Sequence, residues 1–356
     1  MYSISLLSSL FSSFAVAEEP LPAPEPYMLV QIWGTVYDQD EDPMADPATY
    51  GDPEDDVGFK VRRARFGFEG KDAGVKYAVT AGVSAPYDIN AQQNLTEFQV
   101  VDAHIGLKAV KGLWVIGGMQ KLPVSREQLM SSQEITLSER AVSSIWLVPN
   151  REIGMLADYT AGGKNLKARI RAGVFNGNES FLGDNNAGNL YAARAELVSG
   201  SGKVYQTYGS SKKPSIGIGV DYFMNNDLAT TTTSFGADTM VRIQGLAVMA
   251  EARLSNIKPT QTDLADSDVF AEVDRFGYLV QLGYTINSFE PAVRYSTYDD
   301  NQSLVDVGDV SELLSGINYH WRDGQLRAGA GYVVRMETEN AVVNNNTARL
   351  WLEAVY

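Results

Sequence analysis

Residues 75–84 read VKYAVTAGVS, and apolar residues alternate there with small or polar ones. A period of two places the valines and Tyr77 on one face of a β-strand, and Lys76 and Thr80 on the other. The stretch LRAGAGYVVR at 326–335 alternates in the same way. Repeated strands with one apolar and one polar face are typical of a transmembrane β-barrel, because only alternate residues contact lipid there.

The alternation predicts about sixteen antiparallel strands that close into one all-β barrel. The predicted strands lie at residues 28–37, 57–69, 74–84, 99–108, 113–121, 151–159, 166–175, 189–198, 214–224, 237–243, 246–254, 273–285, 289–298, 310–321, 325–336 and 347–356. Long connections, one of them at 225–236, follow the odd-numbered strands. Most connections after even-numbered strands are tight, and the Gly- and Ser-rich stretch 199–213 is the exception.

This asymmetry is typical of bacterial barrels, which have short periplasmic turns and long outer loops. No run of the chain is apolar enough to cross a membrane as a helix. A soluble β-sandwich would also alternate, but it would not require the difference in loop length or so many strands. The sequence therefore favours an outer-membrane barrel.

The N-terminus divides into two short segments before the barrel. Residues 1–17 contain an apolar run that ends in Ala15-Val16-Ala17, which is the pattern of a cleaved signal peptide. Residues 18–26 carry four prolines and form an extended linker. The barrel is expected to occupy residues 27–356.

Composition excludes several classes of function. The chain has no cysteine and a formal net charge of −15, with nine acidic residues and no Lys or Arg between residues 38 and 56. Nucleic-acid binding relies on basic patches, so no nucleic-acid partner is expected. His104 and His320 lie in no metal or nucleophile motif, and we expect neither a cofactor nor enzymatic activity.

The polar face of each strand should line a water-filled lumen, and that face leans basic. Lys167, Arg169 and Arg171 form a ladder at a period of two, and Arg63 and Arg65 form a second pair. Further inward-facing basic residues on later strands are Arg194, Arg294 and Arg327. By the same alternation, Lys60 and Arg62 face outward.

An excess of positive charge in a narrow pore favours anions. The alternative is that cross-strand pairs of Arg and Glu only stabilise the wall and leave the channel unselective.

The connection at 122–150 is the longest, and an ordered connection of this length is expected to have a function. Ser125 and Gln128 fit a helix capping box, which predicts a short helix after Ser125. Folded into the barrel, this third long loop would narrow the pore and bring Lys121, Arg126 and Arg140 toward the solute path.

Four stretches occur in the order and spacing of a known family. They are RRARFGFEG at 62–70, KLPVSRE at 121–127 with SS at 131–132 and ER at 139–140, NREIG at 150–154, and GVFNG at 173–177. Together they resemble the phosphate-selective porins O and P. The resemblance implies a sixteen-stranded, trimeric porin whose third outer loop enters the lumen and whose basic residues guide anions. By motif position, the resemblance assigns this anion-guiding role to Lys121, Arg126 and Arg140.

The sequence thus predicts a porin in the outer membrane of a Gram-negative bacterium. It would pass small hydrophilic solutes passively, with a preference for anions such as phosphate, and it would contact outer-membrane lipid and lipopolysaccharide and form a homotrimer. The alternative is a non-conducting structural or ligand-binding outer-membrane barrel.

Overall fold

The structure, a computed structural model, describes residues 21–38, 57–72, 74–84, 98–177, 188–200, 203–211, 213–227, 229–260, 271–305, 309–338, 342–344 and 346–356. The predicted signal peptide at 1–17 and most of the acidic stretch at 38–56 lie outside these residues. Within the described residues, sixteen antiparallel strands form a closed wall, as predicted, and one additional short strand, β16, pairs with the end of β15.

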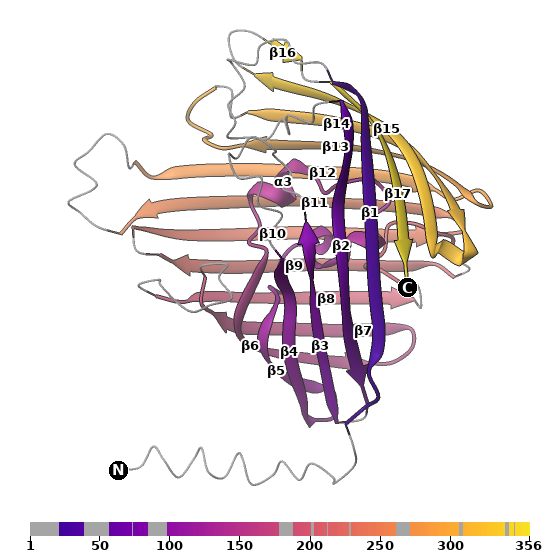
Figure 1. Ribbon diagram of the computed structural model, residues 1–356. Helices are drawn as coiled ribbons and strands as arrows, with labels where there is room; N and C mark the ends of the chain where they lie inside the picture. Colours follow the sequence, from indigo (N-terminus) through magenta and orange to yellow (C-terminus); the bar gives the residue numbers. More distant parts are fainter. Residues whose placement is uncertain are drawn as a thin grey trace, which may run out of the picture.

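Each wall strand pairs with its neighbour in the chain, except at β16, which β17 passes to pair with β15 (Figure 1). The bounds are β1 Glu25–Asp38, β2 Gly58–Lys71, β3 Val75–Ser84, β4 Gln99–Val110, β5 Leu113–Lys121, β6 Arg151–Gly162, β7 Leu166–Phe175, β8 Leu190–Gly200, β9 Ser215–Asn226, β10 Thr230–Ile243, β11 Leu246–Pro259, β12 Val273–Tyr284, β13 Phe289–Asp299, β14 Val310–Trp321, β15 Leu326–Thr338, β16 Val342–Asn344 and β17 Thr347–Val355.

The barrel closes between its first and last strands. β1 pairs with both β2 and β17. The backbone N–H of Met28 donates to the carbonyl of Tyr356 at 2.8 Å, and the N–H of Tyr356 donates back at 2.9 Å. Because both edges of the sheet are paired, the wall leaves no unpaired strand edge at this seam, which is what a sheet in lipid requires.

The two faces of the strands follow the predicted alternation. On β9, the side chains of Ile216, Ile218, Val220 and Tyr222 are 44–55% exposed on the outside, whereas Asp221 is 3% exposed and faces the lumen. An apolar outer face and a charged inner face are the arrangement that lipid outside and water inside impose on a barrel.

The connection predicted at 225–236 is wrong. β9 continues to Asn226 and β10 begins at Thr230, so that Thr231 pairs with Asn226. Threonine is β-branched and favours extended backbone, which extends β10 through the run of threonines at 230–233. β1 begins at Glu25, two residues before the predicted start of the barrel.

A β-bulge on β2 reverses the predicted orientation of two cations. Gln31 pairs with Arg63 and Ile32 with Val61, so Arg62 is the extra residue. Arg62 is 8% exposed and Lys60 lies 5.2 Å from the ring centroid of the buried Trp33, so both face inward rather than outward. An inserted residue shifts the parity of the strand, and alternation alone does not reveal it.

The helices are short: α2 spans Arg126–Leu129, α3 Val142–Trp146, and the 3₁₀ turns η1 and η2 span Ser132–Glu134 and Arg322–Gly324. None of the helices in the described part of the chain is long and apolar enough to cross a membrane.

Candidate functional site

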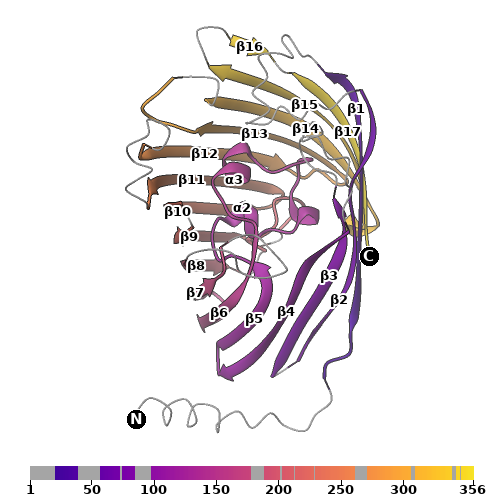
Figure 2. The same ribbon diagram turned by 60° about the vertical axis from the view of Figure 1, so that its left-hand side comes forward.

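The inner loop, residues 122–150, carries α2 and α3 inside the ring of strands (Figure 2). The helix predicted after Ser125 is present: the Ser125 hydroxyl accepts a hydrogen bond from the backbone N–H of Gln128 at 3.1 Å. The Gln128 side chain does not complete a capping box. It donates instead to Asn150 Oδ1 at 3.2 Å, which ties the start of the loop to its end.

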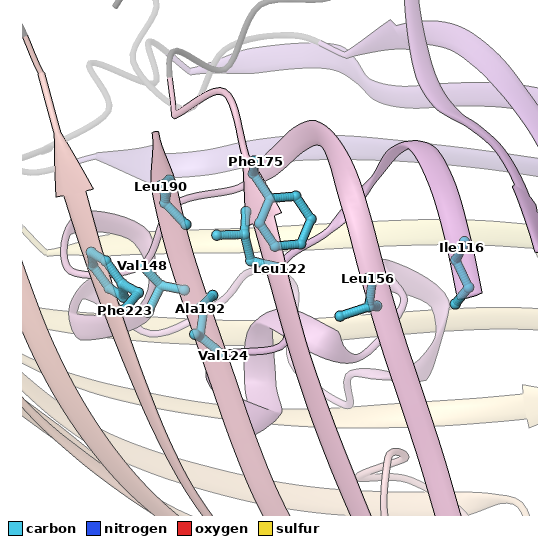
Figure 3. Packing of buried hydrophobic residues seen from close by; sticks show 9 residues of the cluster. All are labelled: Ile116, Leu122, Val124, Val148, Leu156, Phe175, Leu190, Ala192 and Phe223. Carbon is cyan, nitrogen blue, oxygen red and sulfur yellow. The ribbon is translucent and has the colours of Figure 1, made fainter. Parts of the chain in front are cut away.

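Apolar contacts hold the inner loop against the wall. Leu122, Val124 and Val148 pack with inward-facing residues of β5–β9, among them Phe175 and Leu190 (Figure 3). Burial of one such side chain contributes about 1.5–3 kcal/mol. The remaining loop residues in apolar clusters are Met130, Ile135, Leu137, Ala141, Val142 and Leu147, which pack against β10–β15. Part of the inner wall is therefore apolar, although we expected its inward positions to be polar.

Arg126 ties the inner loop to the wall through buried charges. Its fully buried side chain places Nε 2.6 Å from Asp238 Oδ1 and Nη2 2.7 Å from Glu196 Oε1. Arg194 joins the same network, with Nη1 2.9 Å from Asp221 Oδ2. The structure therefore places Arg126 and Arg194 in a buried ion network, and not at the water-lined surface expected for them.

Three more predicted lining residues also hold the loop in place. Arg63 Nη2 and Arg62 Nη2 each lie 2.7 Å from Glu139 Oε2. Arg294 donates to the Glu139 carbonyl at 2.7 Å, and Arg327 donates to the Ile135 carbonyl at 2.6 Å. Arg63, Arg294 and Arg327 are 1–3% exposed, so their charges stabilise the inner loop rather than face the solution. These contacts join the wall to the inner loop, so they are neither the water-facing positions nor only the cross-strand pairs that the sequence predicts.

A second group of cations has no carboxylate partner among the described residues. Arg65 donates to the hydroxyls of Ser132 and Ser84, both at 3.3 Å. Lys121 donates to the carbonyls of Leu129, at 3.3 Å, and Met130. Arg140 donates to the Met130 carbonyl at 2.8 Å. None of these three side chains forms an ion pair within 4 Å among the described residues, and the nearest carboxylates, such as Asp102 and Glu139, act on them only through longer-range attraction.

The electrostatics at Arg140 agree with a local excess of positive charge. Burial and the neighbouring charge of Arg63 lower the pKa of Arg140 to about 10, although Glu139 and Glu127 oppose the shift. An anion that entered this region would be attracted by the remaining positive charge.

A cavity of about 470 Å³ lies between the inner loop and the wall formed by β1–β6. Its charged lining consists of Arg65, Lys71, Lys76, Lys121, Arg151, Glu25, Glu69, Asp102 and Glu134. Arg151 compensates Asp102, with Nε 3.0 Å from Oδ1 and Nη2 3.1 Å from Oδ2. Sequence reasoning missed Arg151, because alternation assigned Glu152 of the same strand to the inner face. The motif NREIG at 150–154 was the available signal.

The three basic residues of β7 lie in three different environments. Lys167 is exposed, Arg169 pairs with Asp158 at 2.8 Å, and Arg171 donates to the Tyr205 hydroxyl at 2.9 Å. The structure thus brings Arg65, Lys121 and Arg140 together at one side of the inner loop. Lys167 and Arg169 are the more exposed members of a separate group on β7.

The pKa values of two acidic residues of the inner loop are shifted in opposite directions. Burial raises the pKa of Glu134, against the Ser131 N–H and Lys121, which lower it. Burial also acts on Glu139, but Arg62, Arg63 and Arg140 outweigh it and hold the pKa of that carboxyl well below its usual range. Glu139 therefore stabilises the folded loop at neutral pH, and this contribution is lost only as pH falls through its lowered pKa. Protonated Glu134 stabilises it at low pH, and that contribution is lost as pH rises through its raised pKa.

Acidification is consequently expected to strengthen anion preference while the loop stays in place. As the pH falls, Glu134 should take up a proton before carboxyls of ordinary pKa, which removes a negative charge from the cavity. Reversal potentials in a salt gradient measure the change. Glu134→Gln should show already at pH 7 the reversal potential that the wild type reaches at acidic pH. An equal change of reversal potential with pH in wild type and variant would contradict the role of Glu134.

No other chemistry stands out in the described residues. His320 Nε2 lies 2.7 Å from Glu290 Oε2 and the ring stacks on Tyr208, which is a structural arrangement. Asp299, Asp300 and Asp309 place carboxylate oxygens within 4.8 Å of one another, but all three are partly exposed, as acidic groups commonly are without a metal ion.

Solved porins share this fold. The anion-selective porin from Comamonas acidovorans is 10% identical, with a TM-score of 0.61 over 94% of this chain and 99% of that chain. The trimer form of OmpT from Vibrio cholerae is 10% identical, with a TM-score of 0.58 over 95% and 100%. The outer membrane channel DcaP of Acinetobacter baumannii is 13% identical, with a TM-score of 0.56 over 94% and 97%. At these identities the likeness concerns the fold alone.

Among curated proteins, no sequence matches this chain. The profile of the phosphate-selective porin O and P family, in contrast, matches residues 39–356, which is nearly the whole barrel. The family match, the closed sixteen-stranded wall and the loop inside it all indicate a porin. The chain belongs to the phosphate-selective porin O and P family and is a porin of the Gram-negative outer membrane.

Proposed function

We propose that this porin passes small hydrophilic solutes by passive diffusion and prefers anions, with phosphate as the first solute to test. The observation that carries the proposal is the group formed by Arg65, Lys121 and Arg140, whose charges have no carboxylate partner among the described residues. In a narrow pore surrounded by lipid, unpaired positive charge lowers the barrier for anions and raises it for cations.

Arg65→Glu combined with Lys121→Glu is expected to shift the reversal potential in a KCl gradient toward cation selectivity, because four units of charge change beside the inner loop. Planar bilayer recordings measure the shift. Lys111→Glu is the control, since Lys111 is exposed in the turn before β5 and lies outside the cavity lining. An unchanged reversal potential in the double variant would contradict the assignment of these side chains to the ion path.

The same recordings separate a channel from a non-conducting structural or ligand-binding barrel. Phosphate added to chloride solution should reduce the chloride current if phosphate dwells at the cations. A folded, heat-modifiable protein that inserts into bilayers without conductance would overturn the porin function for this chain.

We also propose that the protein assembles as a homotrimer, that residues 1–17 are removed as a signal peptide, and that the outer face contacts lipid and lipopolysaccharide. The trimer form of OmpT supports the first point for the shared fold. Chemical crosslinking of the purified protein in detergent tests the trimer. N-terminal sequencing of the mature protein tests the cleavage after Ala17.

A further inference from the structure

The connection between β8 and β9 does not form a tight turn. Within it, the β8–β9 segment, Lys203–Ser211, extends into the barrel: Val204 is 6% exposed and Thr207 is 1% exposed. Val204 packs in one apolar cluster with Met130 of the inner loop and Met240 of β10. By comparison, only Gln244 and Gly245 separate β10 from β11. The β8–β9 connection is therefore longer than a hairpin requires, and its additional residues lie inside the lumen.

The wall holds the β8–β9 segment through two arginines and a histidine. Arg242 donates to the carbonyls of Lys203 at 3.1 Å, Tyr208 at 2.6 Å and Gly209 at 2.6 Å. The Arg327 guanidinium lies 5.4 Å from the Tyr208 ring centroid, and the His320 ring stacks on the same tyrosine. The segment thus covers Arg242 of β10 and packs on Arg327 of β15, which also donates to Glu353 Oε1 at 2.8 Å.

The β8–β9 segment is also joined to the inner loop. The backbone N–H of Thr207 donates to the Glu134 carbonyl at 2.9 Å, and the N–H of Thr136 donates to Thr207 Oγ1 at 2.8 Å. Arg126 donates to the Val204 carbonyl at 3.0 Å. Two connections that enter from different strand pairs therefore form one continuous structure across the lumen.

We infer that the β8–β9 segment is a second constriction element that determines selectivity together with the inner loop. It occupies the lumen against β7, β8 and β10–β15, where Tyr205 contacts Arg171 and Glu196, and it covers Arg242. Solutes are thereby confined to the side lined by Arg65 and Lys121. The inference rests on the proposed channel function, and it assigns to this segment the choice of which cations a solute meets.

Removal of the segment tests the inference. Gly200 and Ser215 are paired across β8 and β9, so replacement of residues 201–214 by Asn-Gly gives a two-residue hairpin that keeps the strands. The shortened protein should conduct at least roughly twofold more than wild type, because a wider lumen offers less resistance. Equal conductance in a folded shortened protein would overturn the inference but leave the channel function intact, whereas a silent wild type would remove the channel function itself.

Cysteine chemistry gives a second readout, because the chain has no cysteine of its own. Ala247, 4% exposed, pairs with Arg242 on one side and with Gly283 on the other, beneath the segment. Ala247→Cys should resist a negatively charged methanethiosulfonate reagent in the full chain and react in the shortened protein. Lys167→Cys is exposed in both and serves as the reactive control.

A crosslink keeps the test decisive if the shortened protein does not fold. The hydroxyls of Thr136 and Thr207 lie 3.0 Å apart, so Thr136→Cys with Thr207→Cys should form a disulfide on mild oxidation. A mobility shift that reduction reverses supports the inward position of the segment. Failure of the two cysteines to crosslink in a folded, conducting barrel would overturn it.

Discussion

Val220→Arg is expected to destabilise the folded barrel by about 2–4 kcal/mol, because it places a charge on the lipid face near the middle of the bilayer. Val220 is 44% exposed on the outside of β9 and is flanked across the sheet by Ala195 and Ala237. It lies close to the centre of the strand. The guanidinium would lie in the hydrocarbon region, away from water.

The measurement is equilibrium unfolding in urea with phospholipid vesicles, followed by tryptophan fluorescence. Ile286→Arg is the matched control, since Ile286 is 52% exposed in the turn between β12 and β13 and so lies near water. The cost there should be about 0–1 kcal/mol, because the penalty falls toward the interfaces. Equal costs at the two positions would contradict the assignment of this face to the lipid interior.

Arg126→Met is expected to release the inner loop from the wall. The substitution leaves the carboxylates of Asp238 and Glu196 short of one buried partner, and removal of one member of a buried ion pair costs about 3–5 kcal/mol. The released loop should be cut by added protease between residues 122 and 150, and the single-channel current should rise. The barrel itself should remain heat-modifiable, because the strand pairing is untouched.

Arg169→Met is the matched control for the loss of a lumenal arginine. Its partner Asp158 lies on the neighbouring strand and not in the inner loop, and the Arg169 side chain is 33% exposed, so its loss should leave the inner loop in place. Arg126→Met with Asp238→Asn removes one charge of each sign and should recover part of the resistance to protease. An inner loop as resistant in Arg126→Met as in wild type would show that the apolar clusters alone hold it.

Most of the wall could be predicted from the sequence. On β15, Arg327 and Arg335 are 2% exposed while Tyr332 is 39% exposed, as alternation requires. The predicted orientation failed on β2, where the bulge at Arg62 inserts one residue and so shifts the alternation of inward and outward side chains. The predicted strand bounds failed where a run of β-branched residues extended a strand, at Thr230.

The role of each lumenal cation was less accessible to prediction. Arg126 and Lys121 belong to one motif and carry the same charge. Arg126 is nevertheless buried in ion pairs, whereas the hydrogen bonds of Lys121 among the described residues go to the carbonyls of Leu129 and Met130. Their partners come from segments as distant as Glu196 and Asp238. The β8–β9 segment was recognised only as a long connection rich in Gly and Ser, and its inward path depends on Arg242, Thr136 and Val204 meeting in space.

The barrel architecture, the inward faces of most strands and the start of α2 follow from local patterns, because a period of two and a helix cap involve residues that are neighbours in the chain. The division of the lumen depends on the fold. Which arginines are neutralised, which cations stay unpaired and which connection fills the other half all follow from contacts between residues far apart in sequence, and those contacts exist only once the sheet has closed.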